Sequence, residues 1–315
     1  MRYRRLGRTN LQVSELSFGA ARGASTQPAE FARTLHAVLG AGINLIDTAP
    51  GYDGGQCERA LGDVLGGQGD VVLETKYCPY DSYLPSAVYN GSPAALTASV
   101  EESLRRMKRG HLDILLGHGL RSVATLDRFM TDGCYDAMVR LQAAGKVRFL
   151  GISELSEADG THEVLRRTVP GGAFDVVMLT LNFLLQTAAK DILPLCQQHD
   201  VGTVVMMPLN QASKESGLVS VAAARELVRR HITAGHLPAI SPFTDPTLFD
   251  FLAPYSVPEA ALRYVLAHPV SSCCVGMQSP DRLADNLRAV DPPYLDDARL
   301  EHLRQLFGGM RRQVF

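Results

Sequence analysis

Short apolar runs alternate with longer helical patterns along most of the chain, and this alternation limits the fold more than any other feature. We expect strands at eight places, near 16–20, 44–49, 71–76, 112–118, 149–153, 176–182, 203–208 and 272–276. Apolar residues recur at helical spacing between them, near 28–40, 57–66, 93–108, 133–144, 156–168, 188–199 and 257–267. Strands that alternate with helices in this way indicate βαβ units and a parallel sheet.

The number of strands favours an α/β fold of the closed (β/α)8 TIM-barrel type. The first strand is not followed by the Gly-x-Gly-x-x-Gly turn of a doubly wound nucleotide-binding sheet, which argues against that alternative. The opening "YRRLGRTNLQVSEL" predicts a β-hairpin ahead of the barrel, and two extra C-terminal helices are expected at 280–290 and 296–308. The longest irregular region, 210–256, is interrupted by a helical stretch near 219–234. Since no linker marks a boundary, we expect one domain over residues 1–315.

Composition excludes several classes of protein. The chain has 315 residues, is 46% hydrophobic, and carries a formal net charge of −2 without a dense basic stripe, so no nucleic-acid partner is expected. Its uncharged runs contain Pro, Gly, Asn and Ser, which argues against a membrane span. The six cysteines have no metal-ligand spacing, and no apolar signal segment follows the first residues. We therefore expect a cytoplasmic monomer or homo-oligomer without a metal.

Polar residues stand where three neighbouring strands end. The second predicted strand ends at Asp47, the third at Lys76 and the fourth at His118. Tyr52 follows the second strand in the Gly-rich loop "APGYDGG". Active sites of (β/α)8 barrels lie at the C-terminal ends of the strands, so these four side chains are expected to converge.

Together the four residues suggest proton transfer to a carbonyl oxygen. A free tyrosine has a pKa near 10, and a lysine ammonium beside it favours the phenolate. Asp47 would hold Lys76, His118 would bind the substrate oxygen or relay a proton, and Tyr52 would act as general acid or base. Each residue alone also has a structural interpretation, as a cap, a solvated strand end or a buried histidine. Their joint placement on consecutive strands favours the functional interpretation.

These segments resemble the aldo-keto reductase family from about residue 1 to 290. "NLIDTAPGYDGGQCERALG", "LETK" and "LDILLGH" are similar to its tyrosine, lysine and histidine segments. "GKVRFLGIS", "VVMMPLN" and "ALRYVLAHPVSSCCVGMQSPDRLADNL" are similar to the fifth-strand, seventh-strand and cofactor segments. The versions "LLGHGL" and "VVMMPL" resemble the branch of bacterial predicted oxidoreductases and sugar dehydrogenases.

The resemblance implies a TIM barrel that transfers a hydride between NADP(H) and an aldehyde, ketone, sugar or alcohol. Asp47, Tyr52, Lys76 and His118 would form the catalytic tetrad. The cofactor positions would be Ser153, Glu154, Met178, Leu209, Gly276, Met277, Gln278, Arg282, Asp285 and Asn286.

Several cofactor positions depart from the family pattern. Glu154 stands where an asparagine usually pairs with the carboxamide, Met178 where a glutamine does, Leu181 where an aromatic residue stacks, and Gln278 where a basic residue meets the 2′-phosphate. Each lost polar contact weakens binding by roughly 0.5–1.5 kcal/mol. NAD(H) in place of NADP(H), and loss of nicotinamide binding, therefore stay open. The alternatives are a redox-neutral acid–base enzyme (dehydratase, isomerase or cyclase) and a cofactor-sensing or scaffold protein.

Overall fold

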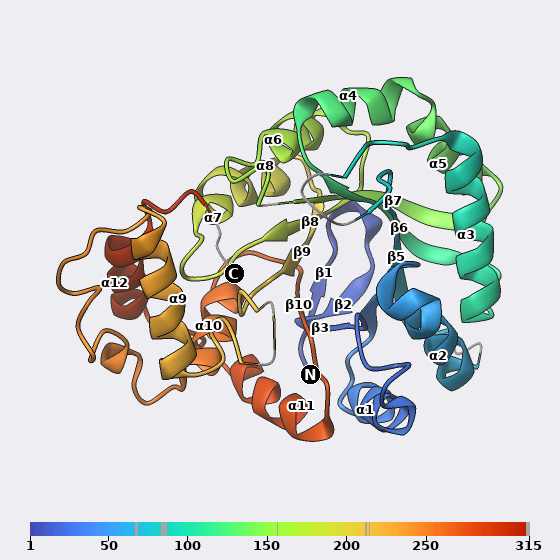
Figure 1. Ribbon diagram of the computed structural model, residues 1–315. Coiled ribbons are helices and arrows are strands. Elements are labelled where there is room, and N and C mark those ends of the chain that lie inside the picture. Colours follow the sequence, from blue (N-terminus) through green and yellow to red (C-terminus); the bar gives the residue numbers. More distant parts are fainter. Residues whose placement is uncertain (67–68, 83–86, 156, 212, 214, 313–315) are drawn as a thin grey trace.

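Eight parallel strands form a closed barrel in the order β10-β3-β4-β5-β6-β7-β8-β9 (Figure 1). The computed structural model describes all residues of the chain except 67–68, 83–86, 156, 212, 214 and 313–315. The barrel strands are β3 (Leu16–Gly19), β4 (Leu45–Asp47), β5 (Val72–Tyr77), β6 (Leu112–Leu120), β7 (Val147–Glu154), β8 (Val176–Thr180), β9 (Gly202–Met206) and β10 (Ser272–Val275). Each overlaps a predicted strand, and the predicted (β/α)8 barrel is confirmed.

Helices surround the barrel on its outer side (Figure 1). The α-helices are α1 (Pro28–Gly40), α2 (Gln56–Leu65), α3 (Pro93–Met107), α4 (Val123–Thr131), α5 (Cys134–Ala143), α6 (Glu163–Gly171), α7 (Thr187–Asp191), α8 (Leu193–Gln198), α9 (Val221–Thr233), α10 (Val257–Leu266), α11 (Pro280–Leu287) and α12 (Asp297–Phe307). Short 3-10 turns are η1 (Gly7–Thr9), η2 (Tyr52–Gly55), η3 (Asp250–Leu252) and η4 (Arg288–Val290). The two extra C-terminal helices are thus confirmed as α11 and α12.

The observed helices differ from the predicted ones at three places. The helix α4 was not predicted; it begins at Val123, after the N-cap Ser122, whose side chain and that of Thr125 cap each other's backbone N–H groups. The helix predicted at 188–199 is divided into α7 and α8, since Pro194 occupies the first turn of the second helix and has no N–H to continue the first. The helix predicted at 156–168 begins only at Glu163, and its predicted first residue lies outside the described ones.

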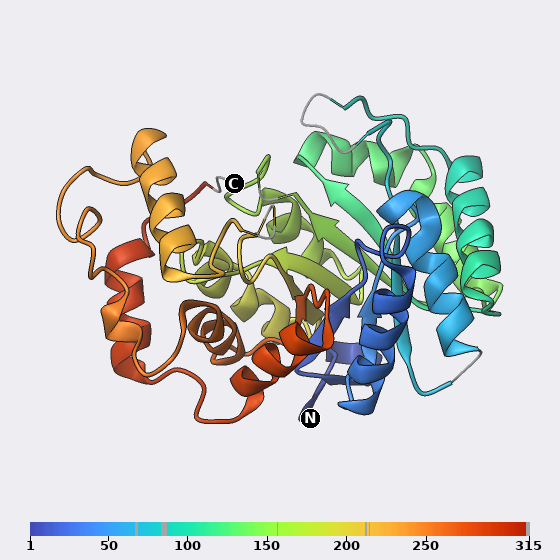
Figure 2. The same ribbon diagram turned by 60° about the horizontal axis from the view of Figure 1, so that its bottom comes forward.

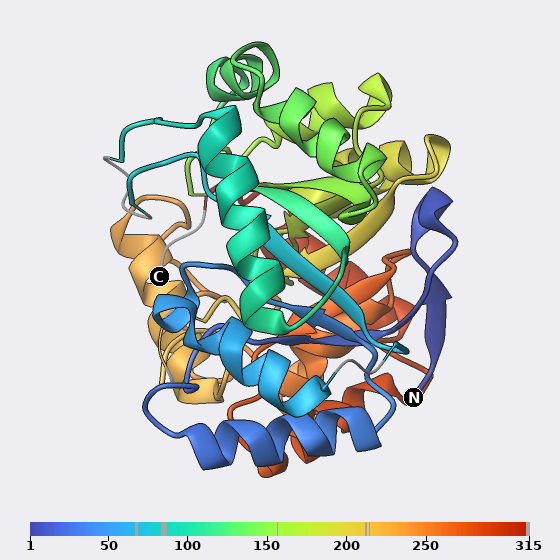
Figure 3. The ribbon, with the colours of Figure 1, turned by 90° about the vertical axis from the view of Figure 1, so that its right-hand side faces the viewer.

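The predicted N-terminal hairpin is present and closes one end of the barrel. Strands β1 (Tyr3–Arg5) and β2 (Gln12–Ser14) pair in antiparallel fashion. Leu6 and Val13 of this hairpin are completely buried and pack against Leu45, Val72 and other apolar residues at the start of the barrel strands. Figure 3 places the hairpin at the end of the barrel opposite the loop that follows β5. The N-terminal ends of the strands are therefore covered, and the C-terminal ends carry the open loops.

Side chains of the strands alternate between two apolar layers. Leu45, Val72, Ile114, Met178 and Val204 belong to a cluster inside the barrel. Their strand neighbours, such as Ile46 and Leu73, belong to the larger cluster between barrel and helices. Successive residues of a strand point to opposite faces, so polar residues two positions apart point the same way.

The last barrel strand leads into α11, which lies beside α1 (Figure 2). Ser279 caps α11 by accepting a hydrogen bond from the backbone N–H of Arg282, and Pro280 occupies its first turn, where a missing N–H costs nothing. This arrangement brings the start of α11 to the C-terminal end of the barrel.

Candidate active site

The four residues predicted to carry the proton chemistry lie together at the C-terminal end of the barrel. Asp47 is the last residue of β4, Lys76 lies in β5, and His118 lies in β6. The Lys76 ammonium forms an ion pair with Oδ1 of Asp47 and donates a hydrogen bond to the carbonyl oxygen of Thr48 at 2.8 Å. Lys76 Nζ is 4.9 Å from the centre of the Tyr52 ring, whose centre is 6.0 Å from that of the His118 ring.

The loop that carries Tyr52 has an unusual backbone. Asp53 adopts a left-handed conformation with φ of 51°, and its carboxylate accepts hydrogen bonds from the backbone N–H, at 2.6 Å, and the hydroxyl of Ser25. Gly55 also has a positive φ, and a side chain there would meet the guanidinium of Arg106 at 3.0 Å. These constraints fix the tight turn that directs Tyr52 toward Lys76.

Burial of charge determines the protonation of the site. Burial raises the pKa of Tyr52 to about 12, and the charge of Lys76 offsets this only in part. Burial lowers the pKa of Lys76, but the charges of Asp47, Tyr52 and Glu74 outweigh it and raise the net value, so Lys76 stays charged. Burial and the charge of Lys76 hold the pKa of His118 well below its usual range, so this imidazole is neutral. Lys76 thus acts on Tyr52 in the predicted direction, while burial dominates the net value.

Three cavities adjoin at this rim. One of about 400 Å³ covers the barrel mouth and is lined by residues that include Phe18, Asp47, Tyr52, Met206 and Cys274. A second, of about 530 Å³, shares Arg22, Tyr52 and Met277 with the first. A third, of about 840 Å³, lies between α1 and α11 and shares Leu209, Gly276 and Gln278 with the first. The shared residues indicate one continuous cleft that leads from Tyr52 to the start of α11.

The predicted residues of the C-terminal cofactor segment line this cleft. Leu209, Gly276, Gln278, Arg282, Asp285 and Asn286 all border the cavity between α1 and α11, and Met277 borders the other two. Arg282 is exposed on the first turn of α11, and Asp285 is paired with Arg288 at 2.6 Å. Where a Cβ of Gly276 would stand, no other heavy atom lies within 4 Å. An exposed cation, a helix N-terminus and open space at a glycine suit the phosphates of a dinucleotide.

The predicted residues at the nicotinamide end lie deeper. Ser153 is buried, and its hydroxyl oxygen accepts a hydrogen bond from the backbone N–H of Gly119 at 3.0 Å. Met178 packs inside the barrel with Leu45 and other apolar residues. Leu181 is completely buried in the outer apolar layer. The Ser153 hydroxyl also donates a hydrogen bond to the carbonyl oxygen of Glu154 at 3.4 Å, so both of its hydrogen-bonding roles are used within the protein.

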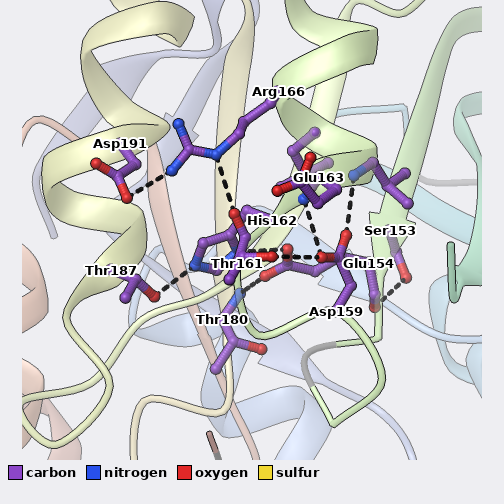
Figure 4. A network of polar contacts seen from close by, with 12 residues as sticks. Ser153, Glu154, Asp159, Thr161, His162, Glu163, Arg166, Thr180, Thr187 and Asp191 are labelled. Carbon is purple, nitrogen blue, oxygen red and sulfur yellow. Dashed lines mark hydrogen bonds and ion pairs between the residues drawn. The ribbon is translucent and has the colours of Figure 1, made fainter. Parts of the chain in front are cut away.

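Glu154 belongs to a sealed polar network beside β7 and α6 (Figure 4). One carboxylate oxygen lies 2.6 Å from Nδ1 of His162, and the other accepts the backbone N–H of Thr180 at 2.7 Å. The other ring nitrogen of His162 is 2.7 Å from the Thr187 hydroxyl, and the Glu154 and His162 side chains are fully buried. Both oxygens of Glu154 are occupied, so this placement argues against direct contact between its carboxylate and a cofactor.

The structure adds site residues that sequence reasoning did not single out. Phe18, Met206 and Cys274 line the cavity over Tyr52. Glu74 is completely buried two residues before Lys76. A carboxylate inside the apolar run "VVLETK" was the signal that could have identified Glu74. The other three are apolar or weakly polar and look like ordinary core residues in a sequence.

Two classes of site find no support in the described part of the chain. No group of three or more His, Cys, Asp or Glu side chains there could hold a metal ion. None of its helices combines the length and apolar character needed to cross a membrane.

Known proteins resemble this chain over nearly its whole length. The family model described as Aldo/keto reductase family matches residues 15–306. The oxidoreductase YqkF of Bacillus subtilis is 25% identical over 96% of both chains. L-galactose dehydrogenase of Arabidopsis thaliana is 29% identical over 91% of this chain and 87% of its own. The holo form of an aldo-keto reductase from Bacillus halodurans has a TM-score of 0.74 and 27% identity, over 98% of this chain and 96% of its own.

The family match and the geometry agree on the class of chemistry. The family model covers the strands that carry Asp47, Lys76 and His118 as well as the segment around Arg282. Reductases and dehydrogenases are the relatives of this chain, which identifies it as an NAD(P)-dependent oxidoreductase. The chain belongs to the aldo/keto reductase family.

Proposed function

We propose that this protein, a single domain over its full length, interconverts a carbonyl compound and the corresponding alcohol with NADP(H), and that Tyr52 is the general acid and base. The contact of the buried Lys76 ammonium with both Asp47 and the Tyr52 ring carries this proposal. A cation fixed beside a phenol stabilises the tyrosinate that forms when the proton leaves. The bound nicotinamide would supply or accept the hydride.

The proton would move at the Tyr52 hydroxyl. With a pKa of about 12 this group is protonated at neutral pH, so it can donate its proton to the oxygen of a carbonyl group whose carbon accepts the hydride. Neutral His118, beside the Tyr52 ring, would donate a hydrogen bond to the same oxygen and orient it. Lys76 keeps its charge throughout and does not transfer a proton, because Asp47 and the surrounding charges hold its pKa high.

The cleft supports a dinucleotide as the second substrate. Arg282 and the start of α11 would hold phosphate groups, while the Ser153 hydroxyl would donate to the carboxamide in exchange for its 3.4 Å bond to the Glu154 carbonyl oxygen. The likeness to L-galactose dehydrogenase favours a sugar or another polyol as the carbonyl substrate. The names of the relatives are those of redox enzymes, so a redox-neutral reaction finds no support among them.

Cofactor binding and turnover test the proposal together. Titration with NADPH and with NADH, followed by nicotinamide fluorescence, should give saturable binding of at least one of them. Reduction of a panel of small aldehydes, and oxidation of L-galactose, should then be measured for the wild type and for Tyr52→Phe. We expect this variant to bind the cofactor normally and to lose about 100- to 10,000-fold in kcat. No binding of either nucleotide at millimolar concentration, or full activity of Tyr52→Phe, would overturn the proposal.

A further inference from the structure

Glu74 is a completely buried carboxyl group that the proposed proton transfer does not use. It lies in β5 between Val72 and Lys76, and residues two apart in a strand share a face, so it points into the barrel. Its Cα partners are Asp47 in β4 and Ile114 in β6. Glu74 therefore lies beside Asp47 and one inward-facing position before Lys76 on its own strand.

The surroundings of Glu74 do not suit a carboxylate ion. Within the described residues no hydrogen-bond donor reaches either of its oxygens. The ionisable groups that face it are Asp47 from β4, Lys76 from its own strand and Cys274 from β10, and β6 presents apolar Ile114. One ammonium faces two buried carboxyl groups, and an unpaired buried charge is strongly unfavourable. Burial, followed by the charge of Asp47, raises the pKa of Glu74 well above its usual range.

A second buried glutamate shows what a paired carboxylate looks like in this fold. Glu58 of α2 is also completely buried, but one oxygen accepts a hydrogen bond from the Thr75 hydroxyl at 2.9 Å and the other from Arg106 at 3.1 Å. Thr75 and Glu74 are neighbours on β5, so the two glutamates lie on opposite faces of the same strand. The face toward the helices supplies donors to Glu58, whereas on the barrel face the Lys76 ammonium donates to Asp47 and to the Thr48 carbonyl oxygen and not to Glu74.

We propose that Glu74 is a positioning residue that stays protonated and donates its hydrogen bond to the Asp47 carboxylate, an inference that rests on the proposed role of Tyr52. This bond holds Asp47 against Lys76 and disperses the negative charge of Asp47. Because the charge of Asp47 opposes ionisation of Tyr52, dispersing it leaves the effect of Lys76 on Tyr52 stronger. A protonated carboxylic acid can act in this way where a carboxylate would oppose the same step.

Infrared spectroscopy and kinetics on the full chain test this inference. The wild type at pH 8 should show the C=O stretch of a protonated carboxylic acid, which should vanish in Glu74→Gln and persist in the control Glu58→Gln. Glu74→Gln keeps a neutral donor and should retain kcat within about threefold, whereas Glu74→Leu, which has no donor, should lose about tenfold or more, the equivalent of one hydrogen bond. The KM for NADPH should be unchanged in both.

The pH profile separates this role from a merely structural one. Ionisation of Glu74 at high pH would place a second negative charge near Tyr52, so kcat for reduction should fall at lower pH in the wild type than in Glu74→Gln. Wild-type kinetics in Glu74→Leu, or the absence of a protonated-carboxyl band from the wild type, would overturn the inference. If Glu74→Leu does not fold, the infrared band of the wild type and the pH profile of kcat in Glu74→Gln test the inference. If the wild type turns over no substrate, the proposed function fails, and the infrared band still tests the protonation of Glu74.

Discussion

The proton-transfer cluster and the cofactor rim share one barrel mouth but are held in opposite ways. Asp47 and Lys76 are almost completely buried, and their mutual ion pair compensates for the loss of water. Gln278, Arg282 and Asp285 on the rim are exposed and are hydrated by solvent. Removing one partner of a buried ion pair leaves the other charge buried and unpaired, whereas water replaces an exposed charge at a small cost in free energy. A single substitution in the buried cluster should therefore cause a large loss of stability and activity. A substitution on the exposed rim should weaken cofactor binding by a small amount that is independent of the other rim residues.

The largest effect is expected from Lys76→Met, which would leave Asp47 buried without its cation. Removing one member of a buried ion pair destabilises a protein by about 3–5 kcal/mol. The free energy of unfolding, measured by denaturant titration, should fall by this amount, and turnover should be lost. The double variant Asp47→Leu, Lys76→Met removes both charges and should recover much of the stability but none of the activity. Equal stability of the single and double variants would contradict this account of the cluster.

A smaller effect is expected from Arg282→Ala on the rim. Losing one charge-assisted contact to a phosphate should weaken NADPH binding about tenfold, or about 1.4 kcal/mol, without changing kcat. Binding of NADH should change less if Arg282 contacts the 2′-phosphate. The control is Arg288→Ala, which removes the surface partner of Asp285 and borders the same cavity. If both variants weaken binding of the two nucleotides equally, Arg282 contributes general charge and not a specific contact.

The smallest change is expected from pH. In reduction the active form of Tyr52 is protonated, so ionisation of Tyr52 itself should lower activity only as pH rises toward about 12. His118 is neutral because its pKa lies well below 6.5, so its protonation should not reduce activity near neutral pH. We expect kcat/KM for aldehyde reduction to be nearly flat between about pH 7 and pH 10. A decline centred near pH 6.5 to 7 would indicate that His118 titrates in that range and is more hydrated than its surroundings imply.

The sequence predicted the barrel and the four clustered residues for the same physical reason. Strand ends are readable from apolar runs: Asp47 ends β4, and Lys76 and His118 interrupt such runs one and two residues before the observed ends of β5 and β6. Parallel topology then brings successive strand ends to one rim without further information. Long-range neighbours are not readable in this way. The partnership of Glu154 with His162 and Thr187 depends on how α6 and α7 pack outside the barrel, and no local pattern encodes it.

The net pKa of Tyr52 could not be predicted from the sequence, because it too depends on long-range packing. The sequence identified a cation near the phenol, and the sign of its influence was correct. The larger influence, burial, depends on the loops that enclose the barrel mouth. Helix α4 was not predicted, and the predicted helix at 188–199 is divided at Pro194. In both cases a cap or a proline changes the boundary of a helix without altering the apolar pattern.

The closure of the barrel has a consequence for biosynthesis. Strand β3 leaves the ribosome well before β10, with which it pairs, and the Arg4 guanidinium donates hydrogen bonds to the carbonyl oxygens of Leu266, His268 and Val270. These partners emerge only after strands β3 to β9 have been translated, so one edge of β3 stays unsatisfied until then. An unpaired strand edge is a site for association between nascent chains. Slow translation between β9 and β10 would lengthen this exposure, and chaperone capture of β3 would protect it.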